Sequence, residues 1–362
     1  MGTRCRAIVV VLLLAAAPAW GWWADGHGVL TRAAVRATPE MLPAFFREGA
    51  DLVAHCAYDP DVIKLRDVPG LRRTEEPEHY LDKELLGERP LPPQRYDFLR
   101  LCAELRLDPH RVGTLPYAVA EGTERLAVAF AEHRKWPRDR FIQQKCLVYA
   151  GIVAHYAQDL CQPLHTTIHF DGRARPDGTS PRSGIHERVD ALIERLALTP
   201  ADLGREQRVE PLADPFAGIV AELGRSHALV DRVYELENEL PPRDVAASAS
   251  WRPSAAIRAF GTERARASVR FTAQLYLTAW QKSASIRLPD WLDRTRLLAP
   301  PARSRDASDL TGTARLEARL HVPARLGGDD AAVLEGILLG ADHLEVDGAG
   351  VAVLMEHSQV AE

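Results

Sequence analysis

Residues 138–165 read RDRFIQQKCLVYAGIVAHYAQDLCQPLH, and this stretch decides the fold class. Apolar side chains recur along it at helical spacing, at Ile142, Cys146, Tyr149, Ile152 and Val153. Pro137 lies near the start of the pattern and Pro163 ends it, because proline lacks the amide hydrogen that a helix interior requires. We therefore predict one long helix over residues 138–162.

Helical periodicity extends over most of the chain, from Gly28 to about Ser283. Two more long helices are expected over residues 214–239 and 262–282. Residues 166–185 are rich in glycine, proline and serine, so a loop is expected there. The sequence thus predicts a mainly α protein with one large helical domain, residues 22–287.

The pattern changes after a stretch rich in proline and arginine, residues 288–305, which is read as a linker. Leu316, Ala318 and Leu320 alternate with polar residues, which favours a strand. Residues 343–356 are typical of a hairpin that turns at Asp347-Gly348-Ala349-Gly350. Residues 306–362 are therefore expected to form a small appendage with β structure.

The first 21 residues have the features of a secretory signal peptide. Arg4 and Arg6 precede an apolar run over residues 8–18, and Ala19-Trp20-Gly21 is a small-x-small cleavage site. The run is too short to span a bilayer comfortably, and no later segment is long and apolar enough. We expect a secreted or periplasmic protein without stable membrane insertion, whose mature chain begins at Trp22.

Composition excludes little else. The formal net charge of −5 does not indicate a polyanion-coating protein, although a local basic groove stays possible. Cleavage of the leader leaves Cys56, Cys102, Cys146 and Cys161, which permit two disulfides or buried thiols. No CxxC pair is present, so any metal ligands must come from histidine and aspartate.

The strongest chemical signal is the motif that contains His155, Asp159 and His165. His155 and Asp159 are four residues apart, so both leave one face of the predicted helix. Pro163 ends that helix, and His165 can then turn back toward the same point. Imidazole nitrogen and carboxylate oxygen are ordinary zinc ligands, while a simple His–Asp hydrogen bond is the alternative explanation.

Weaker signals lie on both sides of this motif. His186 and Asp190 repeat the four-residue spacing, and His79 lies in Glu78-His79-Tyr80. Asp59-Pro60-Asp61 alone would be only a turn. At the expected mature start, the α-amino group and carbonyl of Trp22 could chelate a metal, with His27 as a further ligand.

Taken in order, these motifs resemble the zinc-dependent phosphoesterases that unite fungal and plant single-strand-specific nucleases with bacterial zinc-dependent phospholipase C. The resemblance covers residues 22–190 by motif and implies that family's helical fold. In the family, an N-terminal tryptophan binds zinc through its amine and carbonyl, which matches Trp22. The first carboxylate ligand matches Asp61, with Asp59 and Asp67 as weaker candidates, and the remaining ligands match His27, His79, His155, Asp159, His165, His186 and Asp190.

The resemblance also implies how three zinc ions would be shared. One zinc would take Asp61, His79, His155 and Asp159, and a second would take the Trp22 backbone, His27 and Asp159. The third would take His165, His186 and Asp190. Two close metals lower the pKa of a shared water, which can then act as the nucleophile. Asp61 and Asp159, as ligands of these metals, would be catalytic.

The substrate class is the harder question. The short spacing from Trp22 to His27, the aspartate at position 190 and the step from His165 to His186 favour a nuclease that acts on single-stranded DNA or RNA and releases 5′-mononucleotides. The loop before His186 lacks the nucleases' Gly-Gly-Asn motif, so base-binding residues cannot be carried over. A phospholipase C that cleaves phospholipid headgroups is the alternative, and a non-catalytic zinc-binding protein is the third hypothesis. In each case we expect a monomer.

Overall fold

The computed structural model describes residues 22, 24–243 and 250–294, together with three strands over residues 316–320, 343–347 and 350–355. The predicted leader, residues 1–21, and residues 295–305 of the predicted linker lie outside the described residues. The chain divides into two units, residues 1–292 and 293–362, and each is treated by itself.

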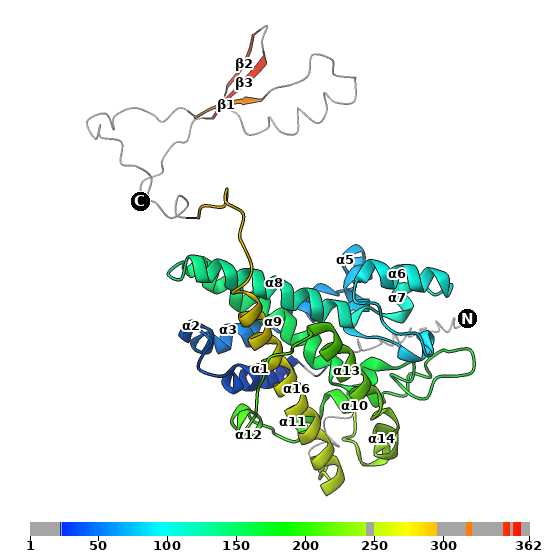
Figure 1. Ribbon diagram of the computed structural model, residues 1–362. Helices are drawn as coiled ribbons and strands as arrows, with labels where there is room; N and C mark the ends of the chain where they lie inside the picture. The colour runs from blue at the N-terminus through cyan, green and yellow to red at the C-terminus, as the bar shows by residue number, and fades with distance from the viewer. Residues whose placement is uncertain are drawn as a thin grey trace, which may run out of the picture. The chain divides into compact units, whose positions relative to one another are not determined.

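The first unit consists of helices, which confirms the mainly α prediction (Figure 1). Its α-helices are α1 (Ala24–Ala37), α2 (Ala44–Glu48), α3 (Ala50–Cys56), α4 (Asp59–Ile63), α5 (Pro69–Glu75), α6 (Arg95–Glu104), α7 (Pro109–Val112), α8 (Leu115–Lys135), α9 (Arg140–Leu160), α10 (Ile185–Asp190), α11 (Leu192–Arg195), α12 (Pro200–Gly204), α13 (Pro215–His227), α14 (Val230–Glu235) and α16 (Ala255–Lys282). Short 3-10 helices are η1 (Glu76–His79), η2 (Lys83–Leu86), η3 (Pro163–Thr166) and η4 (Glu237–Glu239).

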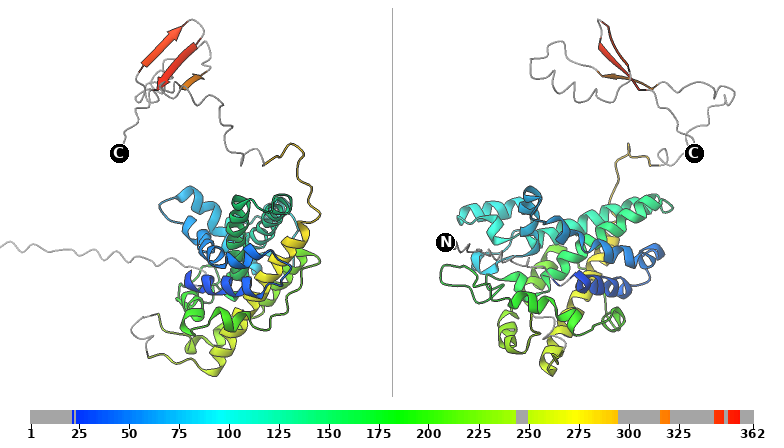
Figure 2. Two further views of the ribbon diagram at one scale, coloured as in Figure 1. Left: turned by 90° about the vertical axis from the view of Figure 1, so that its left-hand side faces the viewer. Right: turned by 180° about the vertical axis from the view of Figure 1, so that it is seen from behind.

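Helix α9 is the centre of this unit, and it packs against α8, α3 and α16 (Figure 2). The Asp139 side chain begins the helix by accepting hydrogen bonds from the amides of Phe141 and Ile142. From Val153 to Leu160 every side chain is buried, polar ones included. A buried polar face is costly unless its groups find partners, so this part of α9 indicates a site rather than ordinary core.

A glycine sets the crossing of α3 and α9. A Cβ atom on Gly151 would lie 2.5 Å from the Val53 carbonyl oxygen and 2.6 Å from the Cys56 Cβ. The two backbones therefore approach more closely than any other residue would allow. Because of this contact, Ala57 lies next to His155. Helix α4, which contains Asp61, follows Ala57 in the chain.

The predicted helix over residues 214–239 is divided into α13, α14 and η4. Tertiary hydrogen bonds anchor the segment on both sides of the break. The His227 Nδ1 donates to the Thr166 carbonyl oxygen at 2.9 Å, and the Arg188 guanidinium donates to the Glu237 carbonyl oxygen at 2.6 Å. The predicted helix over 262–282 is longer than expected, because the Ser254 side chain caps a start at Ala255.

The four cysteines of the described residues are buried free thiols, which decides between the two alternatives left open by the sequence. No helix in the described part of the chain is both long and apolar enough to cross a membrane. In the second unit, β1 (Leu316–Leu320), β2 (His343–Asp347) and β3 (Gly350–Met355) form an antiparallel sheet in the order β1-β3-β2. Asp347 pairs with Gly350, so the hairpin turns where the sequence predicts.

Candidate metal centre

The structure buries all nine residues that the sequence singles out as metal ligands. They come from separate segments: Trp22 precedes α1, which holds His27; α4 holds Asp61; and η1 ends at His79. Helix α9, η3 and α10 contribute the rest, which are His155, Asp159, His165, His186 and Asp190.

The turn after α9 brings His165 back to the helix. The Gln162 side chain accepts a hydrogen bond from the Leu164 amide at 2.6 Å and so caps η3 at Pro163. The His165 Nδ1 then donates to the His79 carbonyl oxygen at 2.6 Å, which joins η3 to η1. Pro163 thus ends the helix as predicted, and the third residue of the motif reaches the same cluster as His155.

Eight of the nine side chains form three groups that could hold a metal ion. Within each group one ligand atom per residue lies within 4.8 Å of the others. The groups are His27, His155 and Asp159; Asp61, His79 and His155; and His165, His186 and Asp190. The indole of Trp22 lies beside the first group, where its Nε1 donates to the Gln158 carbonyl oxygen at 3.1 Å.

In four of the five histidine rings of the cluster, a hydrogen bond at Nδ1 leaves Nε2 facing the cluster. His155, His165 and His186 each donate Nδ1–H to a backbone carbonyl oxygen, those of Ala57, His79 and Phe170, at 2.8, 2.6 and 3.0 Å. His27 donates Nδ1–H to the Gln158 Oε1 at 2.7 Å. These acceptors carry no hydrogen, so in the neutral rings every Nε2 presents a lone pair.

Several of these Nε2 atoms lie close to another hydrogen-bond acceptor, so that two lone pairs face each other. The Nε2 atoms of His165 and His186 are 3.1 Å apart. The His27 Nε2 lies 3.5 Å from the Asp159 Oδ1, and neither atom has a hydrogen-bond partner among the described residues. Such acceptor pairs are repulsive unless a cation lies between them.

Burial opposes protonation of His155, but the Asp159 and then the Asp61 carboxylates raise its pKa above the ordinary value, so a proton could serve there. At His27 and His186 a proton is poorly suited to supply that cation. Burial, followed by the His155 ring, lowers the pKa of His27. Burial and then the neighbouring His165 ring lower the pKa of His186 to about 3. Neutral imidazoles with free Nε2 atoms are the form that binds a metal, so the donor set fits zinc.

Asp159 lies between two of the groups and offers one oxygen to each. Its Oδ1 faces His27, while its Oδ2 lies 3.1 Å from the His79 Nδ1 and 3.3 Å from the His155 Nε2. Burial opposes ionisation, but the His165 and His155 rings hold the pKa of Asp159 well below its ordinary value. The two oxygens of one carboxylate thus face different histidines of the cluster.

Of the three candidates for the first carboxylate, only Asp61 lies in a metal-competent group. Asp61 is buried, whereas Asp59 is half-buried and Asp67 is exposed. The Lys64 Nζ lies 2.6 Å from the Asp61 Oδ1. Burial opposes ionisation of Asp61, but Lys64 and then His155 lower its pKa below the ordinary value. A lysine therefore lies directly at the edge of this group.

Asp190 is poised differently from the other carboxyl groups. Its Oδ1 accepts a hydrogen bond from the Gln162 Nε2 at 2.7 Å, while its Oδ2 finds no hydrogen-bond partner in the described part of the chain. Burial raises the pKa of Asp190 well above its ordinary value. A divalent cation beside the His186 Nε2, which lies 3.3 Å from that Oδ2, would stabilise the ionised form.

The residues that contact the ligand side chains from outside the cluster carry little signal in the sequence. Gln158 and Gln162 lie one turn apart on the same motif as His155 and Asp159, and this spacing was the only signal for them. Glu75 and Tyr156 form a further pair, since the Tyr156 hydroxyl donates to Glu75 and the Glu75 Oε1 lies 3.8 Å from the His79 Nε2. The His79 Nε2 has no hydrogen-bond partner among the described residues, and the ring faces the cluster with Nδ1, unlike the other four histidines.

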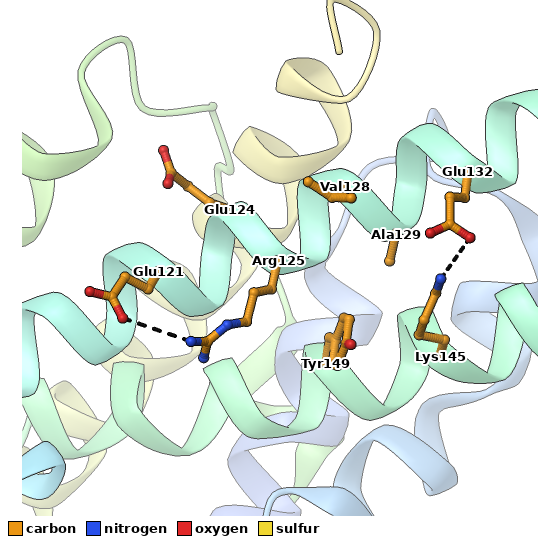
Figure 3. Close-up of a pocket in the computed structure, with 8 residues that line it drawn as sticks. All are labelled: Glu121, Glu124, Arg125, Val128, Ala129, Glu132, Lys145 and Tyr149. Atoms are coloured by element: carbon orange, nitrogen blue, oxygen red, sulfur yellow. Dashed lines mark ion pairs between the residues drawn. The ribbon is translucent and has the colours of Figure 1, made fainter. Parts of the chain in front are cut away.

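Two features near or outside the cluster are not part of it. The His169 Nδ1 accepts a hydrogen bond from the Ala174 amide at 2.9 Å and belongs to none of the three groups. A surface hollow of about 410 Å³ lies between α8 and α9 (Figure 3). Its charges are paired, Lys145 with Glu132 at 2.7 Å and Arg125 with Glu121 at 3.8 Å, and it contains no predicted ligand.

Comparison with known proteins adds little. No family model matches the chain, and no curated protein matches it. Among solved structures, the alpha toxin from Clostridium absonum aligns over 75% of this chain and 68% of its own, at 12% identity and a TM-score of 0.36. A likeness of this size carries no argument about activity.

Proposed function

We propose that this protein is a zinc-dependent hydrolase of phosphoester bonds. The observation that carries the proposal is the junction of three His/Asp groups, with the two oxygens of Asp159 directed at different groups. Nitrogen and carboxylate ligands without thiolates suit zinc.

Bound zinc would supply a hydroxide at neutral pH and would neutralise the charge of a phosphate group. The chain's own residues hold and orient this centre. Asp159 would bridge two metals, and Asp61 would complete the group that contains His79 and His155. The Lys64 ammonium, 2.6 Å from the Asp61 Oδ1, adds a positive charge at the edge of this group, which would favour binding of an anionic substrate.

Single-stranded nucleic acid is the lead substrate, with 5′-mononucleotides as products. Besides the motif spacing, one aromatic side chain supports this choice. The ring of Phe170 is half-buried, and its centroid lies 6.3 Å from that of His186. The Arg182 guanidinium lies 5.6 Å from the centre of the same ring. A flat ring next to an arginine is suited to stack a base and bind its phosphate.

Phospholipid is the second candidate, and a different observation favours it. Directly after Asp61, five aliphatic side chains are exposed to solvent: Val62, Ile63, Leu65, Val68 and Leu71. Helix α5, which follows, buries none of its residues. Aliphatic groups do not stack on bases, and an exposed apolar patch beside a phosphoester site suits a lipid surface.

The test is a parallel assay of zinc-loaded protein beginning at Trp22 on single-stranded DNA, RNA and phosphatidylcholine vesicles. The lead predicts 5′-mononucleotides, together with a raised KM for Phe170→Ala and an unchanged KM for the double variant Leu65→Ser/Leu71→Ser. Phosphocholine release alone, reduced by the double variant and not by Phe170→Ala, would establish the second candidate instead. Zinc-bound protein that cleaves none of the three substrates would overturn the proposed activity.

A further inference from the structure

Gln158 is a fully buried amide whose polar groups contact two segments near the N-terminus. Its Oε1 accepts a hydrogen bond from the His27 Nδ1 at 2.7 Å, and its Nε2 donates to the Thr31 Oγ1 at 2.9 Å. Its backbone carbonyl oxygen accepts a hydrogen bond from the Trp22 Nε1 at 3.1 Å. These partners are more than 120 residues away in sequence, so the contacts exist only in the folded chain.

The contact with Thr31 determines what His27 can do. Because Gln158 Nε2 donates to Thr31, the amide oxygen faces His27 and must accept. Nδ1 of His27 therefore carries the hydrogen, and Nε2 presents its lone pair to the group formed with His155 and Asp159. A hydrogen bond from the outer nitrogen of a ligand histidine commonly fixes its tautomer and ring orientation in this way.

The contact with Trp22 holds the other predicted ligand of the same metal. The indole is completely buried. The Trp22 Cβ lies 3.5 Å from where a Cβ would lie on Gly26, the residue before His27. One residue of α9 thus anchors the tryptophan at the expected mature N-terminus and orients the histidine five positions later.

We propose that Gln158 is the positioning residue of the N-terminal zinc, through which α9 holds His27 and Trp22 in register with Asp159. This inference rests on the proposed zinc centre. Gln162 provides an internal comparison, because the same residue type one turn later donates to Asp190 of a different group at 2.7 Å. Each glutamine therefore serves a different metal.

The test compares zinc binding in five proteins that begin at Trp22: wild type, Gln158→Leu, Gln158→Glu, Gln162→Leu and the double variant Gln158→Leu/Gln162→Leu. Each is equilibrated in a series of zinc buffers, and zinc per chain is measured by elemental analysis. In Gln158→Leu one zinc of three should bind about 10- to 100-fold more weakly. Gln158→Glu keeps an acceptor for His27 and should recover most of that affinity. Gln162→Leu should weaken one zinc also, and the double variant should weaken two.

A second readout assigns the effect to His27. In protein labelled with ¹⁵N-histidine, the wild-type His27 ring should show hydrogen on Nδ1, and Gln158→Leu should lose this preference while the His186 ring keeps it. If Gln158→Leu does not fold, Thr31→Val removes only the acceptor that orients the amide and should give a smaller loss at the same zinc. Three zincs of unchanged affinity in Gln158→Leu, or in Thr31→Val where only that variant folds, would overturn the inference. Wild-type protein without zinc would instead overturn the proposed function.

Discussion

Four of the five histidines of the cluster, His27, His155, His165 and His186, use Nδ1 for a structural hydrogen bond and leave Nε2 facing their neighbours. His155 and His165 show the rule, since each donates Nδ1–H to a carbonyl oxygen of a different segment. The Nε2 atoms of His165 and His27 then meet other acceptors, at 3.1 and 3.5 Å, which a bound metal ion would make favourable. At the residue scale, the metal assignment rests on this pattern and not on the identity of the side chains alone.

Asp159→Asn should abolish activity and disturb two metals, because one amide cannot offer an anionic oxygen to both groups. Loss of several kcal/mol of charge stabilisation corresponds to a fall of at least about a hundredfold in kcat. Zinc content and turnover should be measured on the same preparation. If only one zinc is lost and turnover persists, Asp159 is not the bridge.

Asp82 provides a pH-dependent test outside the ligand set. Burial, and then Glu84, raises its pKa to about 7. The unfolded chain binds that proton only below about pH 4, so the folded state holds it more tightly between the two values. The associated stability is complete below about pH 4 and is lost as the pH rises toward 7.

Asp82→Asn stays neutral and should therefore be more stable than wild type at pH 8, by at most about 4 kcal/mol, with a smaller difference at pH 5. Urea unfolding of both proteins at the two pH values measures this. Asp67→Asn, at an exposed position, is the control and should show no such trend. An Asp82→Asn effect that is equal at both pH values would contradict the account.

The order of the ligand motifs could be predicted from the sequence, but their supports could not. His155 and Asp159 can be recognised from the sequence because they are four residues apart, and residues at this spacing lie on the same face of a helix. Gln158 lies on the same helix, yet its partners are 131 and 136 residues away. No local pattern encodes such contacts. The assignment of the nine residues as ligands remains a prediction, which the structure supports by bringing eight of their side chains into three groups.

Helices were predicted best where the pattern ends at strong local signals. Helix α9 begins beside Asp139 and ends before Pro163, close to the predicted limits. The segment over residues 214–239 has no such internal stop, and bonds from His227 and Arg188 to distant carbonyl groups flank its division. At the element scale, tertiary hydrogen bonds therefore override periodicity.

Two glycines inside helices should respond oppositely to alanine. Gly151→Ala would press a methyl group against the Val53 carbonyl oxygen, 2.5 Å away, and should destabilise the protein by about 1–3 kcal/mol. It should also weaken zinc binding, because it separates α3 and α4 from α9. Gly224 in α13 has open space, so its alanine variant should gain about 0.5–1 kcal/mol with unchanged zinc affinity.

Thermal unfolding of the zinc-free proteins, followed by zinc titration, measures both effects. Equal stability changes in the two variants would show that the α3–α9 contact is not tight. Normal zinc affinity in a destabilised Gly151→Ala protein would show that the crossing does not position Asp61.

At the scale of the whole molecule, export and metal binding are proposed to be coupled. If the leader is removed after Gly21, the new amino group of Trp22 becomes available beside His27. A protein that keeps even one extra N-terminal residue should bind one zinc fewer by elemental analysis, with its other two sites intact. Unchanged zinc content in the extended protein would refute ligation by the N-terminus.

The central claim is that the three His/Asp groups hold three zinc ions. Anomalous X-ray scattering at the zinc absorption edge, from crystals of the protein that begins at Trp22, tests it directly. The account predicts three peaks, beside His27 and Asp159, beside Asp61 and His79, and beside His165 and Asp190. Density for water or bare hydrogen bonds at these positions, without anomalous signal after zinc loading, would contradict it.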